Sequence, residues 1–216
     1  MKRLKLVLFD MDGVLTDFQN SWTVLHEYFG TNNEKSLHQF LRGEIDDREF
    51  IRRDIALWLK KRNRIHISEI EKAVSHVTAS EDARVFMRFL SANNIKGAII
   101  TGGVDIFANR IGKELGIHIV RANGFILDDE GYLTGEGVVN VPLRHKDIVA
   151  RKIREEMNVT KAECVAIGDS FIDVPMFKEA RFGIAVRAQD DTVRDAARYS
   201  ISNLVDAIPI LCETFS

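Results

Sequence analysis

The short apolar run at residues 6–9 ends abruptly at two carboxylates, Asp10 and Asp12, which are followed by Gly13. Four apolar residues bounded in this way are typical of a buried parallel strand. Because side chains alternate along an extended backbone, Asp10 and Asp12 point to the same side, where their charges repel unless a cation lies between them. Carboxylate oxygens are suitable ligands for a divalent metal, and open α/β sheets bind ligands at the carboxyl ends of their strands. The segment therefore predicts a metal site at a strand end.

Three more apolar runs, at residues 97–100, 164–167 and 183–186, alternate with helical patterns. One helix begins at Ser80, and another runs from about Asp105 to Gly116. This alternation predicts an α/β fold, in which a Rossmann-like parallel sheet carries helices on both faces. With 216 residues the chain is long enough for one sizeable core and a small accessory module.

Residues 17–78 break this rhythm because they contain helical patterns only. The expected helices cover 21–29, 34–41, 47–61 and 68–77, and the last opens with Ser68 and Glu71 at the spacing of a capping box. We interpret the segment as a small all-helical cap inserted after the first strand, where it would lie over the strand ends. The predicted domains are a core of residues 1–16 and 79–216 and a cap of residues 17–78. A β-hairpin is expected over 124–141, flanking the sheet.

Composition narrows the classes of partner. A formal net charge of −2 gives no reason to expect nucleic acid or an anionic membrane as a partner. The apolar run after Lys5 is too short for the hydrophobic region of a signal peptide, and nothing approaches the length needed to span a bilayer. Cys164 lies in an apolar run, so we expect a buried and unreactive thiol. A cytoplasmic location is the default expectation.

Three more polar clusters follow Asp10 and Asp12 along the chain. Thr101 and Gly102 come directly after the second apolar run, Lys146 opens a later helix, and Asp169 and Asp173 follow the third run. Glycine permits close backbone approach to a ligand, and the N–H groups of a helix start favour an anion. Each cluster is a weak signal alone, but their joint order at strand ends is hard to obtain by accident.

With these motifs the chain resembles the haloacid dehalogenase (HAD) superfamily of phosphohydrolases, and within it the phosphoserine phosphatase-like branch. The resemblance covers nearly the whole length and includes the helical cap and the stretches 102–106 and 133–135. It implies a Mg²⁺-dependent phosphomonoester hydrolase that acts on a small phosphorylated metabolite through an aspartyl-phosphate intermediate.

The resemblance also implies a role for each motif residue. Asp10 would attack phosphorus, and Asp12 would serve as general acid and then general base. Mg²⁺ would be bound by Asp10, the backbone carbonyl of Asp12, and Asp169, while Asp173 would support the metal or the lysine. The phosphoryl oxygens would be held by Thr101, the Gly102 N–H and Lys146.

The substrate-binding positions depart from the branch. Where phosphoserine phosphatases typically use a glutamate and a cap arginine to hold the amino and carboxylate groups, this chain has Gln19 and Asp54. A carboxylate in place of arginine reverses the charge offered to a substrate carboxylate. If the cap alignment shifts by one or two residues, Arg52 or Arg53 would supply the cation. Gln19, Asp54, Arg52 and Arg53 are therefore candidate substrate-binding residues, and phosphoserine is a doubtful substrate.

Some alternatives stay open at this point. Asp54 is either a solvated or salt-bridged helix carboxylate or a pocket residue. The aromatic residues Trp22, Phe29 and Trp58 are expected to form the core of the cap. At the level of function, the same residues would also suit a phosphotransferase or mutase, and a third possibility is a non-catalytic regulatory scaffold on a degenerate core.

Overall fold

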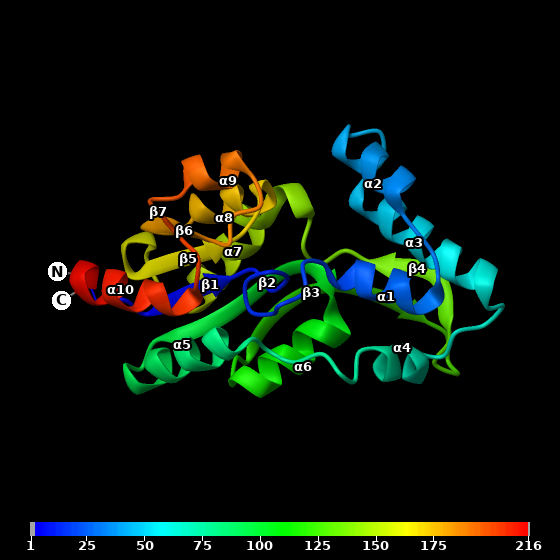
Figure 1. Ribbon diagram of the computed structural model, residues 1–216, viewed down its shortest axis with the longest axis horizontal. Coiled ribbons are helices and arrows are strands. Elements are labelled where there is room, and N and C mark those ends of the chain that lie inside the picture. The colour runs from blue at the N-terminus through cyan, green and yellow to red at the C-terminus, as the bar shows by residue number, and fades with distance from the viewer. Residues whose placement is uncertain (1–2, 216) are drawn as a thin grey trace.

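A mostly parallel sheet runs through the molecule in the strand order β4-β3-β2-β1-β5-β6-β7 (Figure 1). The computed structural model describes residues 3–215, and within that range the sheet has seven strands. β4 alone is antiparallel to its neighbour in this sheet of the described residues. The strands are β1 (Leu6–Phe9), β2 (Lys96–Val104), β3 (Ile119–Leu127), β4 (Leu133–Val138), β5 (Cys164–Gly168), β6 (Phe182–Val186) and β7 (Tyr199–Ile201). This confirms the predicted α/β fold.

The strand register brings the polar clusters together. β1 lies between β2 and β5, and Phe9 at its end pairs with Ile99 on one side and Ile167 on the other. Residues that follow these three positions therefore emerge at the same edge of the sheet. All four residues of β1 are fully buried, as expected for a central parallel strand covered on both faces.

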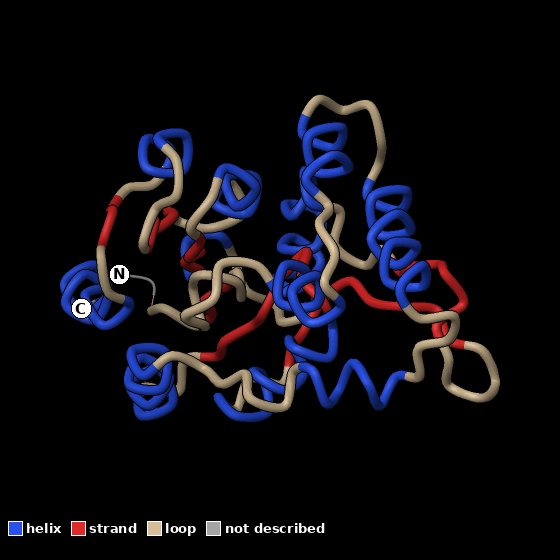
Figure 2. Tube along the Cα trace, turned by 45° about the vertical axis from the view of Figure 1, so that its right-hand side comes forward, coloured by secondary structure: helices blue, strands red, loops and turns tan. Residues whose placement is uncertain are grey.

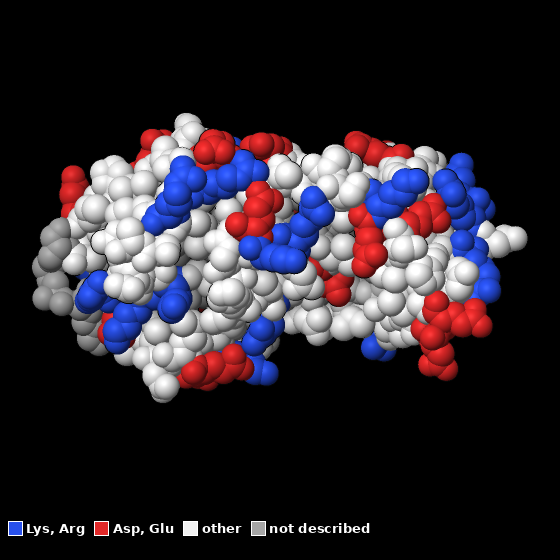
Figure 3. Space-filling view, turned by 90° about the horizontal axis from the view of Figure 1, so that it is seen from below, with Lys and Arg blue, Asp and Glu red and all other residues white. Residues whose placement is uncertain are grey.

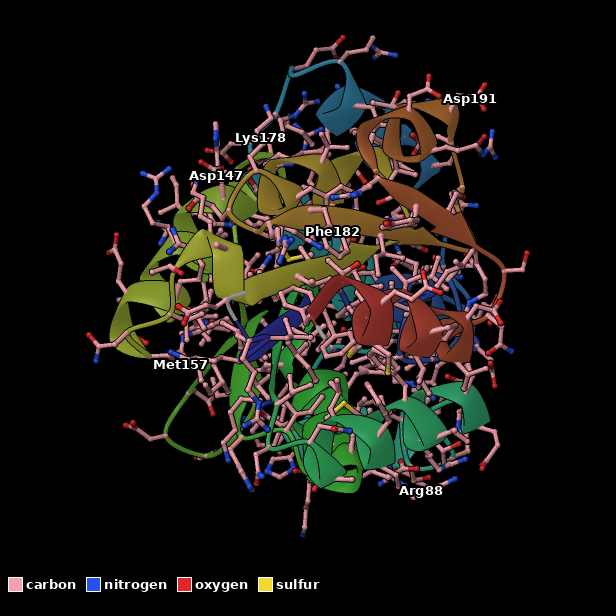
Figure 4. The ribbon with its side chains drawn as sticks, turned by 90° about the vertical axis from the view of Figure 1, so that its left-hand side faces the viewer. Arg88, Asp147, Met157, Lys178, Phe182 and Asp191 are labelled. Atoms are coloured by element: carbon pink, nitrogen blue, oxygen red, sulfur yellow. The ribbon has the colours of Figure 1, made fainter. Side chains whose placement is uncertain are left out.

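Helices cover both faces of the sheet. One layer contains α5 (Glu81–Ala92), α6 (Asp105–Leu115) and α10 (Ala207–Phe215), and the other contains α7 (Lys146–Glu156), α8 (Val174–Phe177) and α9 (Asp191–Ala196). In Figure 4, Arg88 on α5 and Asp191 on α9 lie at opposite rims, with Phe182 of β6 between them. Short 3₁₀ turns occupy Leu143–His145, Lys161–Glu163, Phe171–Asp173 and Leu204–Asp206.

Residues 17–78 hold four helices beyond one end of the core: α1 (Ser21–Phe29), α2 (Glu34–Leu41), α3 (Asp47–Lys61) and α4 (Ile67–Ala73). In Figure 1 the β3–β4 hairpin extends out of the core with α2 and α3 above it and α4 below it, and in Figure 2 its strands lie at the same end of the molecule as these helices. The contact with α3 is close, because a Cβ on Gly137 of β4 would overlap the Ile51 side chain. Trp22, Phe29 and Trp58 are buried, and Trp58 stacks on both of the others, which confirms the expected aromatic core.

Two local predictions differ from the structure. α4 begins at Ile67 rather than Ser68, because the His66 side chain accepts the Ser68 N–H and serves as the N-cap. It ends at Ala73 rather than near residue 77, since the chain turns there and Arg110 of α6 binds the carbonyls of Ser75 and Val77. His66 and Arg110 therefore determine the two ends of α4, and neither belongs to the predicted capping box of Ser68 and Glu71.

The predicted hairpin over 124–141 is present as β3 and β4, but β3 starts at Ile119 and belongs to the main sheet. The hairpin therefore widens the sheet rather than standing beside it. Cys164 is fully buried, and burial raises the pKa of its thiol to about 12. The expected unreactive environment is confirmed.

Over the described residues, the longest apolar helix is too short to cross a lipid bilayer. On the face shown in Figure 3, Lys and Arg side chains are interspersed with Asp and Glu side chains.

Candidate active site

A buried lysine joins the first acidic motif to the last. Lys146, the first residue of α7, is 2% exposed, and its Nζ donates to Asp10 Oδ1 and to Asp173 Oδ1, both at 2.7 Å. Asp173 Oδ2 accepts the backbone N–H groups of Asp169 and Ser170 at 2.9 and 3.2 Å. Asp173 therefore fixes both the lysine and the loop that follows β5.

Three of the carboxylates form one cluster. Asp10, Asp169 and Asp173 are buried, and each places a carboxylate oxygen within 4.8 Å of the others. The Asp169 carboxylate also accepts from the side-chain amide of Gln189. Gly13 has φ +70°, and a Cβ there would overlap Asp169 Oδ2. The glycine after the first acidic motif is thus needed for the close approach of Asp169 from the last.

Burial and like charge raise the pKa values of Asp10 and Asp169. The pKa of Asp10 is raised chiefly by burial, and the nearby Lys146 only partly offsets this. The pKa of Asp169 is raised by burial and then by Asp10 and Asp173. Burial alone would lower the pKa of Lys146, but Asp10 and Asp173 outweigh it, so the ammonium form is strongly favoured. The site has more negative than positive charge, as a cation site requires.

Asp12 is held by the first residue of α1. Asp12 Oδ2 accepts both the backbone N–H and the hydroxyl of Ser21, each at 2.9 Å. Its other oxygen, Oδ1, is buried and has no hydrogen-bond partner in the described structure. Burial raises the pKa of Asp12 to about 6, although the Ser21 hydrogen bonds lower it. A carboxyl with this pKa can give and take a proton near neutral pH.

The loop at the end of β2 lies against the same cluster. Thr101 is 1% exposed, and its Oγ1 accepts the N–H of Gly103 at 2.9 Å. The Gly102 carbonyl accepts from Trp22 Nε1 of α1 at 3.0 Å and from Asn123 Nδ2 of β3 at 3.3 Å. These hydrogen bonds fix the loop to α1 on one side and to the sheet on the other.

A cavity of about 260 Å³ opens above these residues. Its lining includes the motif residues Asp10, Asp12, Thr101, Gly102, Lys146 and Asp169. Gln19 and Asp54 also line it, and Gln19 Oε1 accepts from Gln189 Nε2 at 2.6 Å. The structure therefore brings the predicted nucleophile, acid–base and phosphate-binding positions to one cavity.

Asp54 is buried, so its interpretation as a solvated carboxylate is wrong. It is 1% exposed, accepts from Asn33 Nδ2 at 2.9 Å, and lies 3.3 Å from His26 Nε2. Arg52 and Arg53 lie outside the cavity, in an outer groove between α2 and α3, where both bind Glu49. They face away because they precede Asp54 by one and two positions on a helix, which places them on another face.

Sequence reasoning missed the side chains that hold the motif residues in place. Ser21 and Trp22 at the start of α1, Asn123 on β3 and Gln189 after β6 contribute through hydrogen bonds to carboxylates or backbone. These four residues are not part of any sequence motif that would have indicated a site. The one available signal was Asn20, a favourable N-cap residue whose side chain accepts from Trp22 N and fixes the start of α1.

Comparison with known proteins agrees with this geometry. Residues 4–181 match the haloacid dehalogenase-like hydrolases. The phosphoserine phosphatase of Methanocaldococcus jannaschii is 31% identical over 87% of this chain and 88% of its own length, and that of Streptococcus thermophilus is 30% identical over 96% of each.

Solved structures agree as well. One titled as a phospho-aspartyl intermediate analogue of phosphoserine phosphatase has a TM-score of 0.81 at 27% identity, with 97% of this chain and 99% of that chain covered. A substrate-bound phosphoserine phosphatase has a TM-score of 0.81 at 26% identity, with the same coverage. The chain therefore belongs to the haloacid dehalogenase-like hydrolase family, among its phosphatases.

Proposed function

We propose that the chain is a Mg²⁺-dependent phosphomonoester hydrolase that acts on a small phosphorylated metabolite through an aspartyl-phosphate on Asp10. The observation that supports this best is the buried charge balance. Asp10, Asp169 and Asp173 are buried and Asp12 is half-buried beside them, whereas Lys146 is the one lysine or arginine among the described residues that line the cavity. A divalent cation would offset the excess negative charge, and carboxylate oxygens are its preferred ligands.

The donor set fits Mg²⁺. Asp10, Asp169 and the backbone carbonyl of Asp12 would bind it, while Asp173 is already engaged by Lys146 and by two backbone N–H groups. When bound, the metal would let an anionic nucleophile approach an anionic phosphoryl group.

The residues divide the reaction into two displacements. In the first, an Asp10 oxygen forms a bond to phosphorus, the ester P–O bond breaks, and Asp12 gives its proton to the departing alkoxide. In the second, water attacks the aspartyl-phosphate, Asp12 takes the proton, and the bond from Asp10 to phosphorus breaks. Thr101, the Gly102 N–H and Lys146 would hold the phosphoryl oxygens throughout.

We also propose that residues 17–78 act as a cap and the remainder as the catalytic core. Ser21 and Trp22 support this assignment, because the first helix of the segment contacts both Asp12 and the Gly102 carbonyl. The substrate's leaving group would lie between this helical segment and the core, beside Gln19 and Asp54.

Phosphate release from a panel of phosphomonoesters, with Mg²⁺ and with EDTA, tests the function. We expect release that requires Mg²⁺ and is abolished in Asp10→Asn. Retained turnover in that variant would overturn the nucleophile assignment. Appearance of the phosphoryl group on an added alcohol, instead of as inorganic phosphate, would favour a phosphotransferase.

A further inference from the structure

The part of the cavity formed by residues 17–78 is mainly apolar. Trp22 of α1, Phe40 of α2, and Phe50 and Ile51 of α3 line it, and Leu143 of the core lies among them. The cavity is also bordered by three large apolar side chains that are more than a third exposed: Leu37, Leu41 and Phe171. Apolar side chains grouped at an opening favour a ligand that covers them with apolar surface of its own.

The charged groups of this part of the lining are both carboxylates. Asp47 accepts the Leu143 N–H at 2.9 Å, and Asp54 is buried beside Asn33. Among the described residues of the lining, Lys146 provides the one ammonium or guanidinium group, and it is shared by Asp10 and Asp173. An acidic group on the leaving part of a substrate would therefore have no cation to pair with.

Nearby arginines do not change this balance. Arg144 Nη2 donates to the carbonyls of Phe40 and Leu41 at 3.1 and 2.9 Å, and it caps the end of α2 instead of lining the cavity. Arg52 and Arg53 bind Glu49 in the outer groove.

Asp54 cannot easily turn away from an approaching anion. Asn33 holds one carboxylate oxygen, and the Ser36 hydroxyl lies 3.4 Å from the other. His26 lies on the same side: its Nε2 is 3.3 Å from Asp54 Oδ2, and its Nδ1 accepts from Trp58 Nε1 at 3.1 Å.

We infer, on the basis of the proposed phosphatase function, that the substrate is a phosphomonoester whose leaving group has an apolar body and no carboxylate. A hydroxyl or ammonium group would suit the Asp54 side of the cavity. A carboxylate placed there would lie near two like charges in a buried setting, which is costly unless a cation is present. Phosphoserine lacks the apolar body and carries the unfavourable group.

Matched esters separate these effects in the Mg²⁺-loaded protein. Benzyl phosphate and para-carboxybenzyl phosphate differ by one carboxylate, as do phosphoethanolamine and phosphoserine, while ethyl phosphate differs from benzyl phosphate by the apolar ring. We expect kcat/KM to be at least about tenfold lower for para-carboxybenzyl phosphate than for benzyl phosphate, and for phosphoserine than for phosphoethanolamine. It should be at least about tenfold higher for benzyl phosphate than for ethyl phosphate.

The Asp54→Asn variant identifies the residue responsible. We expect the penalty for para-carboxybenzyl phosphate relative to benzyl phosphate to shrink several-fold in this variant. It should remain unchanged in Glu71→Gln, which alters an exposed carboxylate on α4. Circular dichroism and the urea unfolding midpoint report whether Asp54→Asn is folded.

Equal or faster hydrolysis of the carboxylate-bearing esters would overturn the inference while leaving the phosphatase function intact. An equal kcat/KM for ethyl phosphate and benzyl phosphate would also overturn it. An undiminished penalty in folded Asp54→Asn would overturn the role of this residue. Absence of phosphate release from every ester would instead overturn the proposed function, and the inference with it.

Discussion

Ser21 donates its backbone N–H and its hydroxyl to the same oxygen of Asp12, each at 2.9 Å. Ser21 is the first residue of α1, and Asp12 lies two residues after Asp10, which directly follows β1. The start of the inserted helical segment therefore orients the proposed acid–base group directly. Asp12 Oδ1 remains available, so the arrangement leaves one carboxylate oxygen for proton transfer.

Ser21→Ala should shift the pH dependence of the reaction. The hydroxyl lowers the pKa of Asp12, which burial raises to about 6. Its loss should therefore move the limb of the kcat–pH profile that reports Asp12 to higher pH by roughly one unit. Ser91→Ala, an exposed serine on α5, is the control and should match wild type. A lower rate with an unshifted profile would contradict this role.

Gln189→Leu should weaken metal binding. The Gln189 amide bridges the Asp169 carboxylate and Gln19, so its removal frees a proposed metal ligand to rotate. Loss of such an outer hydrogen bond typically costs about 10–100-fold in metal affinity. The measurement is the Mg²⁺ concentration for half-maximal rate, with Gln39→Leu on α2 as control. An unchanged Mg²⁺ dependence would exclude this role for Gln189.

Two glycines with the same backbone angle allow a controlled test of the acidic cluster. Gly13 and Gly116 both have φ +70°, but a Cβ would overlap Asp169 at Gly13 and meet no atom within 4 Å at Gly116. Alanine at either position should cost about 1–2 kcal/mol in unfolding free energy from the left-handed conformation. Only Gly13→Ala should also abolish phosphate release. Equal activity in the two variants would show that Asp169 tolerates displacement.

The buried carboxylate of Glu179, which binds two arginines of α7, should make the free energy of unfolding sensitive to acid. Burial raises the pKa of Glu179, but Arg154, Arg151 and Lys161 outweigh it and lower the value to about 2. Because the folded pKa lies below the unfolded one, the stabilisation is complete above about pH 4.5 and is lost as the pH falls toward 2.

Glu179→Gln should therefore unfold more easily than wild type at pH 7, by about 3 kcal/mol. The difference in unfolding free energy should narrow as the pH falls from 5 to about 2.5, as measured by urea titration. Glu27→Gln, on an exposed position of α1, should show no such trend. A constant difference across this range would contradict the assignment.

The sequence allowed prediction of the strand ends that carry chemistry, because short apolar runs followed by carboxylates have a direct physical meaning. Lys146 and Asp10 are 136 residues apart, and it was the family resemblance that predicted their place in one site. The supporting residues were not predictable in this way. Ser21 and Gln189 each make two hydrogen bonds at the site, to partners that are defined only once the loops after β1 and β6 have folded.

Helix ends show the same limit. The Ser68–Glu71 spacing is a valid capping pattern, yet His66 caps α4, and Arg110 from another helix binds the carbonyls beyond its end. The sequence left Asp54 open between a solvated or salt-bridged carboxylate and a pocket residue, because its surroundings are set by Asn33 and His26, which lie outside its own helix. Local pattern specifies the face of a helix, and tertiary contacts decide what covers it.

Covalent trapping on Asp10 tests the central claim most directly. The Mg²⁺-loaded protein is mixed with a hydrolysed ester, quenched in acid within one turnover, and measured by intact mass and peptide mapping. The account predicts the mass of one added phosphoryl group, located on Asp10 and absent from Asp10→Asn. A phosphoryl group on another residue, or phosphate release by Asp10→Asn at the wild-type rate, would contradict it.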